Sequence, residues 1–124
     1  MEHYDPVRAP KPDEWLSLDE QERHLLVEQF HRKAKLKVPN LRLHAIFHVI
    51  VENQLAASDP PAVRVTLDRL MREGLSRHDA IHAIGSLAAE HVFDAMHPER
   101  SRGDANAVYV AKLQKLSAAN WGNG

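Results

Sequence analysis

The sequence predicts an all-α protein, a compact four- to five-helix bundle with an extended N-terminal arm. Apolar residues recur at the three- and four-residue spacing of a helix face across most of residues 17–119. No segment shows the strict alternation of apolar and polar residues that is typical of a half-buried strand. The 124 residues fit one helical domain at 17–119, with an arm at 1–16 and a frayed tail at 120–124.

The arm and the first helix are separated by a capping pattern. Residues 1–16 carry three prolines, and each one disfavours helix and restricts the residue before it. We therefore expect an extended arm. Ser17 followed by Glu20 forms a capping box, which predicts that the first helix begins there. Pro39 then stops the helix. Its apolar residues recur at helical spacing over 17–37 and form the expected buried face: Leu18, Leu25, Leu26, Phe30 and Ala34.

Three or four further helices follow. The predicted helix at 40–57 has apolar side chains around nearly its whole circumference, which is typical of a buried helix. The next, at 59–73, begins with Asp-Pro-Pro, in which the aspartate caps and the prolines occupy the first turn. A helix at 76–96 opens on a Ser-x-x-Asp capping pattern. After a polar loop at 98–104, a last helix is expected at 105–119.

The composition argues against several kinds of partner. The chain has no cysteine, so it forms neither disulfides nor thiolate metal sites. A net charge of -1 gives no reason to expect nucleic acid or an anionic membrane. No apolar run approaches the roughly 20 residues of a membrane span, and the polar, proline-containing start is unlike a secretory signal. We therefore expect a cytoplasmic protein.

The clearest functional signal is a pair of matching His-x-x-x-His steps, each followed by a glutamate. Residues four apart lie one above the other on a helix face. Packing the helix at 40–57 against the helix at 76–96 would bring four imidazoles and two carboxylates into one small volume. The candidate metal ligands are His44, His48, Glu52, His78, His82 and Glu90.

A metal ion explains these residues because buried polar groups without partners are costly, and one ion satisfies several of them together. Nitrogen and oxygen ligands favour zinc or iron here, with manganese, nickel and copper also open, as one ion or two. Glu52 continues the stripe of His48 by one turn. Glu90 follows His82 by eight residues and drifts about 80° around the helix. Each carboxylate is a candidate ligand, acceptor for a ring N–H, or general base.

Three functions are consistent with this pattern. The first is a metal-binding helical-bundle protein, with hydrolytic or oxidative chemistry at one or two ions. The alternative is a non-catalytic interaction or regulatory module whose histidines form a buried polar network. Haem binding ranks third, because few aromatic residues are available to line a haem pocket. A site made of two half-motifs also leaves open a homodimer that completes it across the interface.

The other histidines carry no site prediction. His24 and His31 are expected on the solvated side of the first helix, and His91 and His97 at the surface or a helix end. The basic stretch 31–37 offers contacts for phosphate, but at a net charge near zero we interpret it as a solvated helix end.

A family resemblance covers residues 43–91. This stretch runs from a His-x-x-x-His helix with a following glutamine through an Asp-x-Pro turn and an Arg-containing helix to His-x-Ala-x-His and a later glutamate. In this order it resembles the bacterial family called domain of unknown function 1841. The matching positions are His44, His48, Gln54, Asp59, Pro61, Arg64, His78, Ala80, His82 and Glu90. The resemblance implies these site positions and a bacterial origin, and it implies no reaction.

Overall fold

The computed structural model describes residues 1–36, 38, 40–97, 99 and 104–122, and every regular element within them is helical. The helices are α1 (Pro12–Ser17), α2 (Glu20–Lys33), α3 (Leu41–Ala57), α4 (Pro61–Arg72), α5 (Arg77–Met96), α6 (Ala105–Lys115) and α7 (Ala118–Gly122). The predicted all-α bundle is confirmed. Helices α1 and α7 are short, with 6 and 5 residues, and the other described helices have 11 or more.

The first helix boundary differs from the prediction. Pro12 begins α1 inside the segment that was expected to be extended, because a proline in the first turn lacks only an N–H that has no helical partner there. The capping box at Ser17 is wrong, since Ser17 is the last residue of α1. Asp19 caps α2 instead, and its side chain accepts a hydrogen bond from a backbone amide two residues later.

Helices α3 and α5 begin close to where they are expected. The side chains of Asn40 and Ser76 each accept a backbone hydrogen bond at the start of α3 and α5. The predicted cap of α4 is wrong, because the N-cap residue is Pro60 rather than Asp59 and no side chain caps the helix. The helix expected at 105–119 ends as α6 at Lys115, with an extended backbone at Leu116. Helix α7 then runs to Gly122, so residues 120–122 of the predicted frayed tail are helical. The predicted end and stop of the first helix at 37 and 39, most of the 98–104 loop, and the last two residues of the tail lie outside the described residues.

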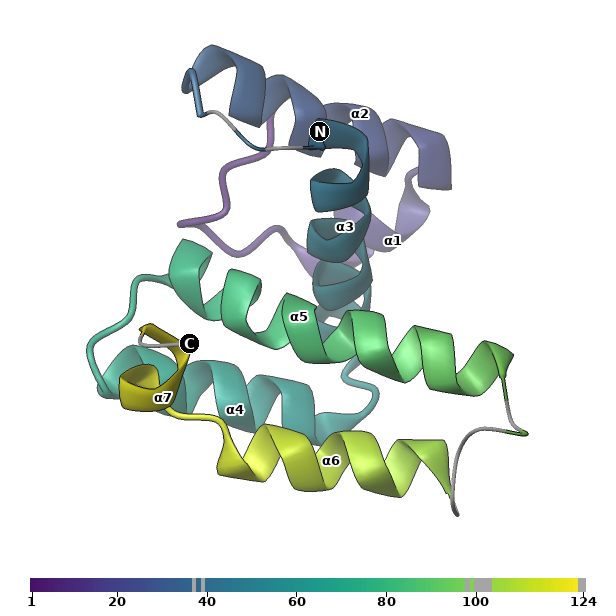
Figure 1. Ribbon diagram of the computed structural model, residues 1–124. Coiled ribbons are helices and arrows are strands. Elements are labelled where there is room, and N and C mark those ends of the chain that lie inside the picture. Colours follow the sequence, from purple (N-terminus) through teal and green to yellow (C-terminus); the bar gives the residue numbers. More distant parts are fainter. Residues whose placement is uncertain (37, 39, 98, 100–103, 123–124) are drawn as a thin grey trace.

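Helix α3 is the element around which the others assemble. It contacts α1, α2, α4 and α5, and it joins a layer made of α4, α5 and α6 to the α1 and α2 pair (Figure 1). Within the described residues, no helix is both long and apolar enough to cross a bilayer.

Two separate apolar clusters share α3. The C-terminal core consists of Val51, Leu55, Val63, Leu67, Leu70, Ala80, Ile81, Ala83, Ile84, Ala88, Tyr109 and Leu113. The N-terminal core is smaller and consists of Tyr4, Trp15, Leu26, Val27, Ala45 and Val49. Helix α3 contributes residues to both cores, and the buried His48 and Glu52 lie between those residues along the helix.

Candidate metal centre

Five histidines from three helices meet where α2, α3 and α5 come together. Each offers one ring nitrogen, and these five nitrogens lie within 4.8 Å of one another. The group consists of His31 on α2, His44 and His48 on α3, and His78 and His82 on α5. In the described part of the chain, no carboxylate belongs to the group.

The two predicted His-x-x-x-His steps account for four of the five rings. Within each step the two rings are neighbours along the helix with inclined planes, and their centroids are 4.9 Å apart for His44 and His48 and 4.3 Å apart for His78 and His82. Packing of α3 on α5 then brings the steps together, and the His44 and His82 centroids are 4.6 Å apart. The structure therefore brings these four histidines together.

His31 is the fifth member, and the prediction that it is solvated is wrong. Its side chain is 1% exposed, and its ring centroid lies 4.6 Å from that of His44 and 4.8 Å from that of His48. The sequence signal for this position is Val27, which lies one turn earlier on the same face and is completely buried. Leu25, which was assigned to the buried face, is instead exposed.

Three of the rings present a buried nitrogen with no hydrogen-bond partner. These atoms are Nε2 of His31, His44 and His78. For His31 the other nitrogen defines the tautomer, because Nδ1 lies 2.8 Å from the carbonyl oxygen of Val27 and a carbonyl only accepts. Nδ1 therefore carries the proton, and Nε2 presents a free lone pair to the other rings.

His48 is oriented by a chain of buried polar groups. The Tyr4 hydroxyl donates to Glu52 Oε2 at 2.6 Å, so its oxygen accepts from His48 Nδ1 at 3.2 Å. Arg77 holds the carboxylate in turn, with Nη1 and Nη2 at 2.8 and 2.7 Å from its two oxygens. Arg77 Nη1 also donates to the carbonyl oxygen of Pro6 at 2.9 Å. This chain leaves the lone pair of His48 on Nε2.

The facing pair of Nε2 atoms marks the centre of the cluster. His48 Nε2 lies 2.9 Å from His82 Nε2. Because His48 carries its proton on Nδ1, His82 donates this hydrogen bond from Nε2. A metal ion would replace that shared proton, and both nitrogens would then act as ligands.

The two predicted carboxylates lie outside the group of ring nitrogens. Glu52 is buried beside His48, with its oxygens bonded to Arg77 and Tyr4. Burial works to lower the pKa of Arg77, but the hydrogen bond and charge of Glu52 outweigh it and raise that pKa. Glu90 is exposed on α5, where it accepts a 2.8 Å hydrogen bond from Lys112. Spacing predicted the burial of Glu52 but not its partners.

Burial lowers the pKa of the four histidines on α3 and α5 and so favours their neutral form. Burial, and then the nearby His31 and His78, lower the pKa of His44 to about 4. Burial, and then His78 and His44, lower the pKa of His82 to about 3. The pKa of His48 is also lowered, by burial first and by the facing His82 second. Neutral rings keep the lone pairs that metal ligands need.

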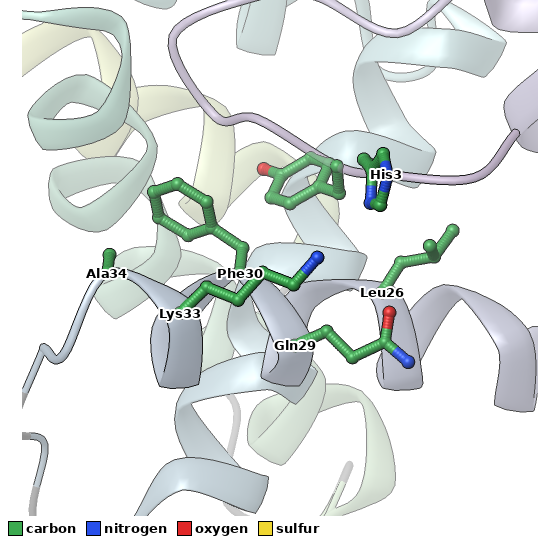
Figure 2. A pocket seen from close by; sticks show the side chains of 7 residues that line it. His3, Leu26, Gln29, Phe30, Lys33 and Ala34 are labelled. Carbon is green, nitrogen blue, oxygen red and sulfur yellow. The ribbon is translucent and has the colours of Figure 1, made fainter.

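A small pocket adjoins the cluster, and a larger hollow lies close to it. A pocket of about 110 Å³ is lined by His44, Phe47, His48, Ile81, His82 and Ser86. A larger hollow of about 380 Å³ lies between the N-terminal segment, which carries His3, and the α2 side chains Leu26, Gln29, Phe30 and Lys33 (Figure 2). The ring of Phe30 also packs edge-on against His31 and His78, so this side chain separates the larger hollow from the cluster.

The remaining histidines lie elsewhere. His24 is half-buried on α2, with Nε2 3.5 Å from Glu20. His97 follows α5, and its Nδ1 donates to the carbonyl oxygen of Phe93 at 3.0 Å. His91 stacks on Tyr109 at a centroid distance of 4.5 Å. In the basic stretch, residues 32–36 are exposed, as predicted, while its first residue belongs to the cluster.

The chain belongs to the family described as Domain of unknown function (DUF1841), whose model matches residues 10–115. The match includes all five clustered histidines together with Glu52 and Arg77. It extends well beyond the resemblance at 43–91 and takes in α2, which carries His31. No curated protein and no solved structure matches the chain.

Proposed function

We propose that this protein binds one divalent transition-metal ion through the five-histidine cluster. The observation that carries the proposal is the set of three buried Nε2 atoms, on His31, His44 and His78, that have no hydrogen-bond partner. These three rings belong to the same group of histidines as His48 and His82. A buried polar atom left unpaired costs about 1–3 kcal/mol. A single ion would satisfy all three.

The alternative of a purely structural polar network is less well supported. In such a network the ring nitrogens would bond to one another or to nearby side chains. His48 does so, with His82 at 2.9 Å and with Tyr4 at 3.2 Å, but among the described residues Nε2 of His31, His44 and His78 has no such partner. Nδ1 of His31 and Nδ1 of His48 each donate a hydrogen bond to a neighbouring oxygen. Metal-binding imidazoles are oriented in the same way, since the ring nitrogen that does not bind the metal donates to an outer partner.

The ligand set favours zinc or iron(II) and a single ion. Imidazole suits zinc, iron, nickel and copper, whereas manganese prefers oxygen ligands. Two nitrogens bound to one ion at about 2.1 Å lie at most about 4.2 Å apart. The cluster spans up to 4.8 Å, so loading would draw the rings together by a few tenths of an ångström. Two divalent ions would place four positive charges among neutral ligands. This cost favours a single ion.

Such an ion would be a strong Lewis acid. Its ligands are neutral, so it would keep its full charge and polarise a bound water or dioxygen. The oxygens of the buried Glu52 are already bonded to Arg77 and Tyr4. Hydrolytic or oxidative chemistry at this centre would therefore depend on the ion and its imidazoles rather than on a carboxylate base.

The test is metal stoichiometry in untagged protein. We expect about one equivalent of zinc or iron by elemental analysis, and a clear loss in His31→Gln. The matched control is His24→Gln, a histidine on the same helix outside the cluster, which should keep the wild-type metal content. Wild-type protein that purifies without metal and shows no thermal shift with added zinc or iron(II) would favour the structural network instead.

A further inference from the structure

The small pocket beside the cluster is the place where an external ligand would meet the ion. It has a volume of about 110 Å³, and three of the five histidines line it: His44, His48 and His82. A second hollow, of about 210 Å³, contacts the cluster through His44 alone. Because water occupies about 30 Å³ per molecule in the liquid, the small pocket holds about three or four non-hydrogen atoms.

Charge defines which ligand the pocket would take. Neutral imidazoles contribute no negative charge to the ion. The buried Glu52 carboxylate beside His48 is neutralised by Arg77, at 2.7 and 2.8 Å. Asp5 and Asp79 act on His78 electrostatically, but both are exposed to solvent. A loaded centre would thus hold about two unbalanced positive charges in a largely buried site, which is costly unless an anion joins it.

We propose that a monoanion of three or four non-hydrogen atoms binds in this pocket as a further ligand of the ion. The inference rests on the proposed metal-binding function and adds the chemical class of its external ligand. A larger organic anion would extend beyond this volume toward solvent, and the positive charge of the centre disfavours cations.

The residues that line the pocket imply that the anion would bind mainly to the ion. Phe47 and Ile81 are apolar, and the hydroxyl of Ser86 already donates to the carbonyl oxygen of Ala83 at 2.8 Å. Among the residues that the structure describes, no lysine or arginine lines the pocket. With so few hydrogen-bond donors available, binding of the anion should be lost when the metal is removed.

The experiment uses the full chain loaded with cobalt(II), whose visible spectrum reports a change of ligand. Azide, with three non-hydrogen atoms, and benzoate, with nine, are titrated as monoanions of small and large size. We expect azide to change the spectrum with saturation and benzoate to leave it unchanged. Isothermal titration of azide into the metal-free protein should show no binding.

A variant that fills the pocket gives a second readout. Ser86 is exposed at the pocket, and Ser86→Phe should weaken azide binding more than 10-fold while cobalt stoichiometry stays at the wild-type level. The control is Val92→Phe, at an exposed position of the same helix outside the pocket, which should bind azide as wild type does. The comparison of azide with benzoate in wild-type protein stands whether or not either variant folds.

The outcomes separate this inference from the proposed function. Protein that takes up no cobalt would overturn the metal site and the anion site together. Cobalt uptake without an azide response would overturn the anion site alone. A benzoate response equal to that of azide would contradict the size limit, and unchanged azide binding in Ser86→Phe would show that the anion reaches the ion elsewhere.

Discussion

The C-terminal core and the histidine cluster both lie against α3 and α5, but different interactions hold them. Val51 and Leu55 of α3 pack among aliphatic side chains that are 3% exposed or less. One to three turns earlier, His44 and His48 meet other imidazoles and an ionic network that reaches the N-terminal segment. Beside the C-terminal core a single buried ring nitrogen among the described residues has no partner, Nδ1 of His91, whereas three such nitrogens belong to the cluster. The difference indicates that α3 supports the fold at one end and a binding site at the other.

The largest effect should come from breaking the ion pair that supports the cluster. Arg77→Met leaves the Glu52 carboxylate buried with only Tyr4 as a partner, so the free energy of unfolding should fall by about 3–5 kcal/mol. Denaturant unfolding measures the change. Lys112→Met removes an exposed pair with Glu90 and should cost under about 1 kcal/mol. Equal losses in the two variants would contradict the structural role given to Arg77.

A cavity in the apolar half should weaken the fold without touching the site. Leu70 is completely buried in the C-terminal core, and Leu70→Ala should lower the free energy of unfolding by about 2–5 kcal/mol. The stabilisation produced by added zinc should stay the same as in wild type, because the two halves contain different residues. Thermal unfolding with and without zinc gives both numbers, and a lost zinc response would show that the halves are coupled.

The sequence was sufficient for most of the fold because its signals are local. Asn40 and Ser76 cap the helices that carry the two histidine pairs, and the i, i+4 spacing alone places each pair on one face. His31 was missed because the face of α2 was assigned through Leu25 rather than Val27. Because α2 has charged residues on several sides, its amphipathic pattern is compatible with either Leu25 or Val27 on the buried face.

The partners of Glu52 cannot be predicted from the sequence, for a different reason. Tyr4 and Arg77 are 48 and 25 residues away in the chain, so no helical spacing relates them to Glu52. Glu90 is the opposite case. It is close to a histidine pair in the sequence, but in the structure its carboxylate binds Lys112 on the neighbouring α6. Pairs within one helix are predictable, whereas contacts between distant segments depend on how the helices pack.

A moderate effect is expected from the hydroxyl that orients His48. Tyr4→Phe keeps the ring in the N-terminal core but removes the acceptor for His48 Nδ1 and the donor to Glu52. Outer partners of metal-binding histidines typically contribute 10- to 100-fold in affinity, so zinc should bind about that much more weakly. Competition with a chelator measures the change. Affinity equal to wild type would mean that the tautomer of His48 is fixed by other contacts.

The most gradual effect is the response of the metal-free protein to acid. In the folded state the pKa of His44 is about 4 and that of His82 about 3, against 6.5 for an ordinary histidine. Below pH 6.5 the unfolded chain therefore binds more protons than the folded one, and the free energy of unfolding should fall as the pH drops from 6.5 toward 4. Denaturant unfolding at several pH values tests this. A stability that stays constant over that range would contradict burial of neutral rings.

Anomalous diffraction from crystals of untagged protein tests the central claim most directly. At the absorption edge of the metal found by elemental analysis, a single peak should lie between α2, α3 and α5, at about 2.0–2.2 Å from ring nitrogens that include Nε2 of His31. Density for water molecules alone, with the rings hydrogen-bonded through them, would contradict a metal centre and support a buried polar network.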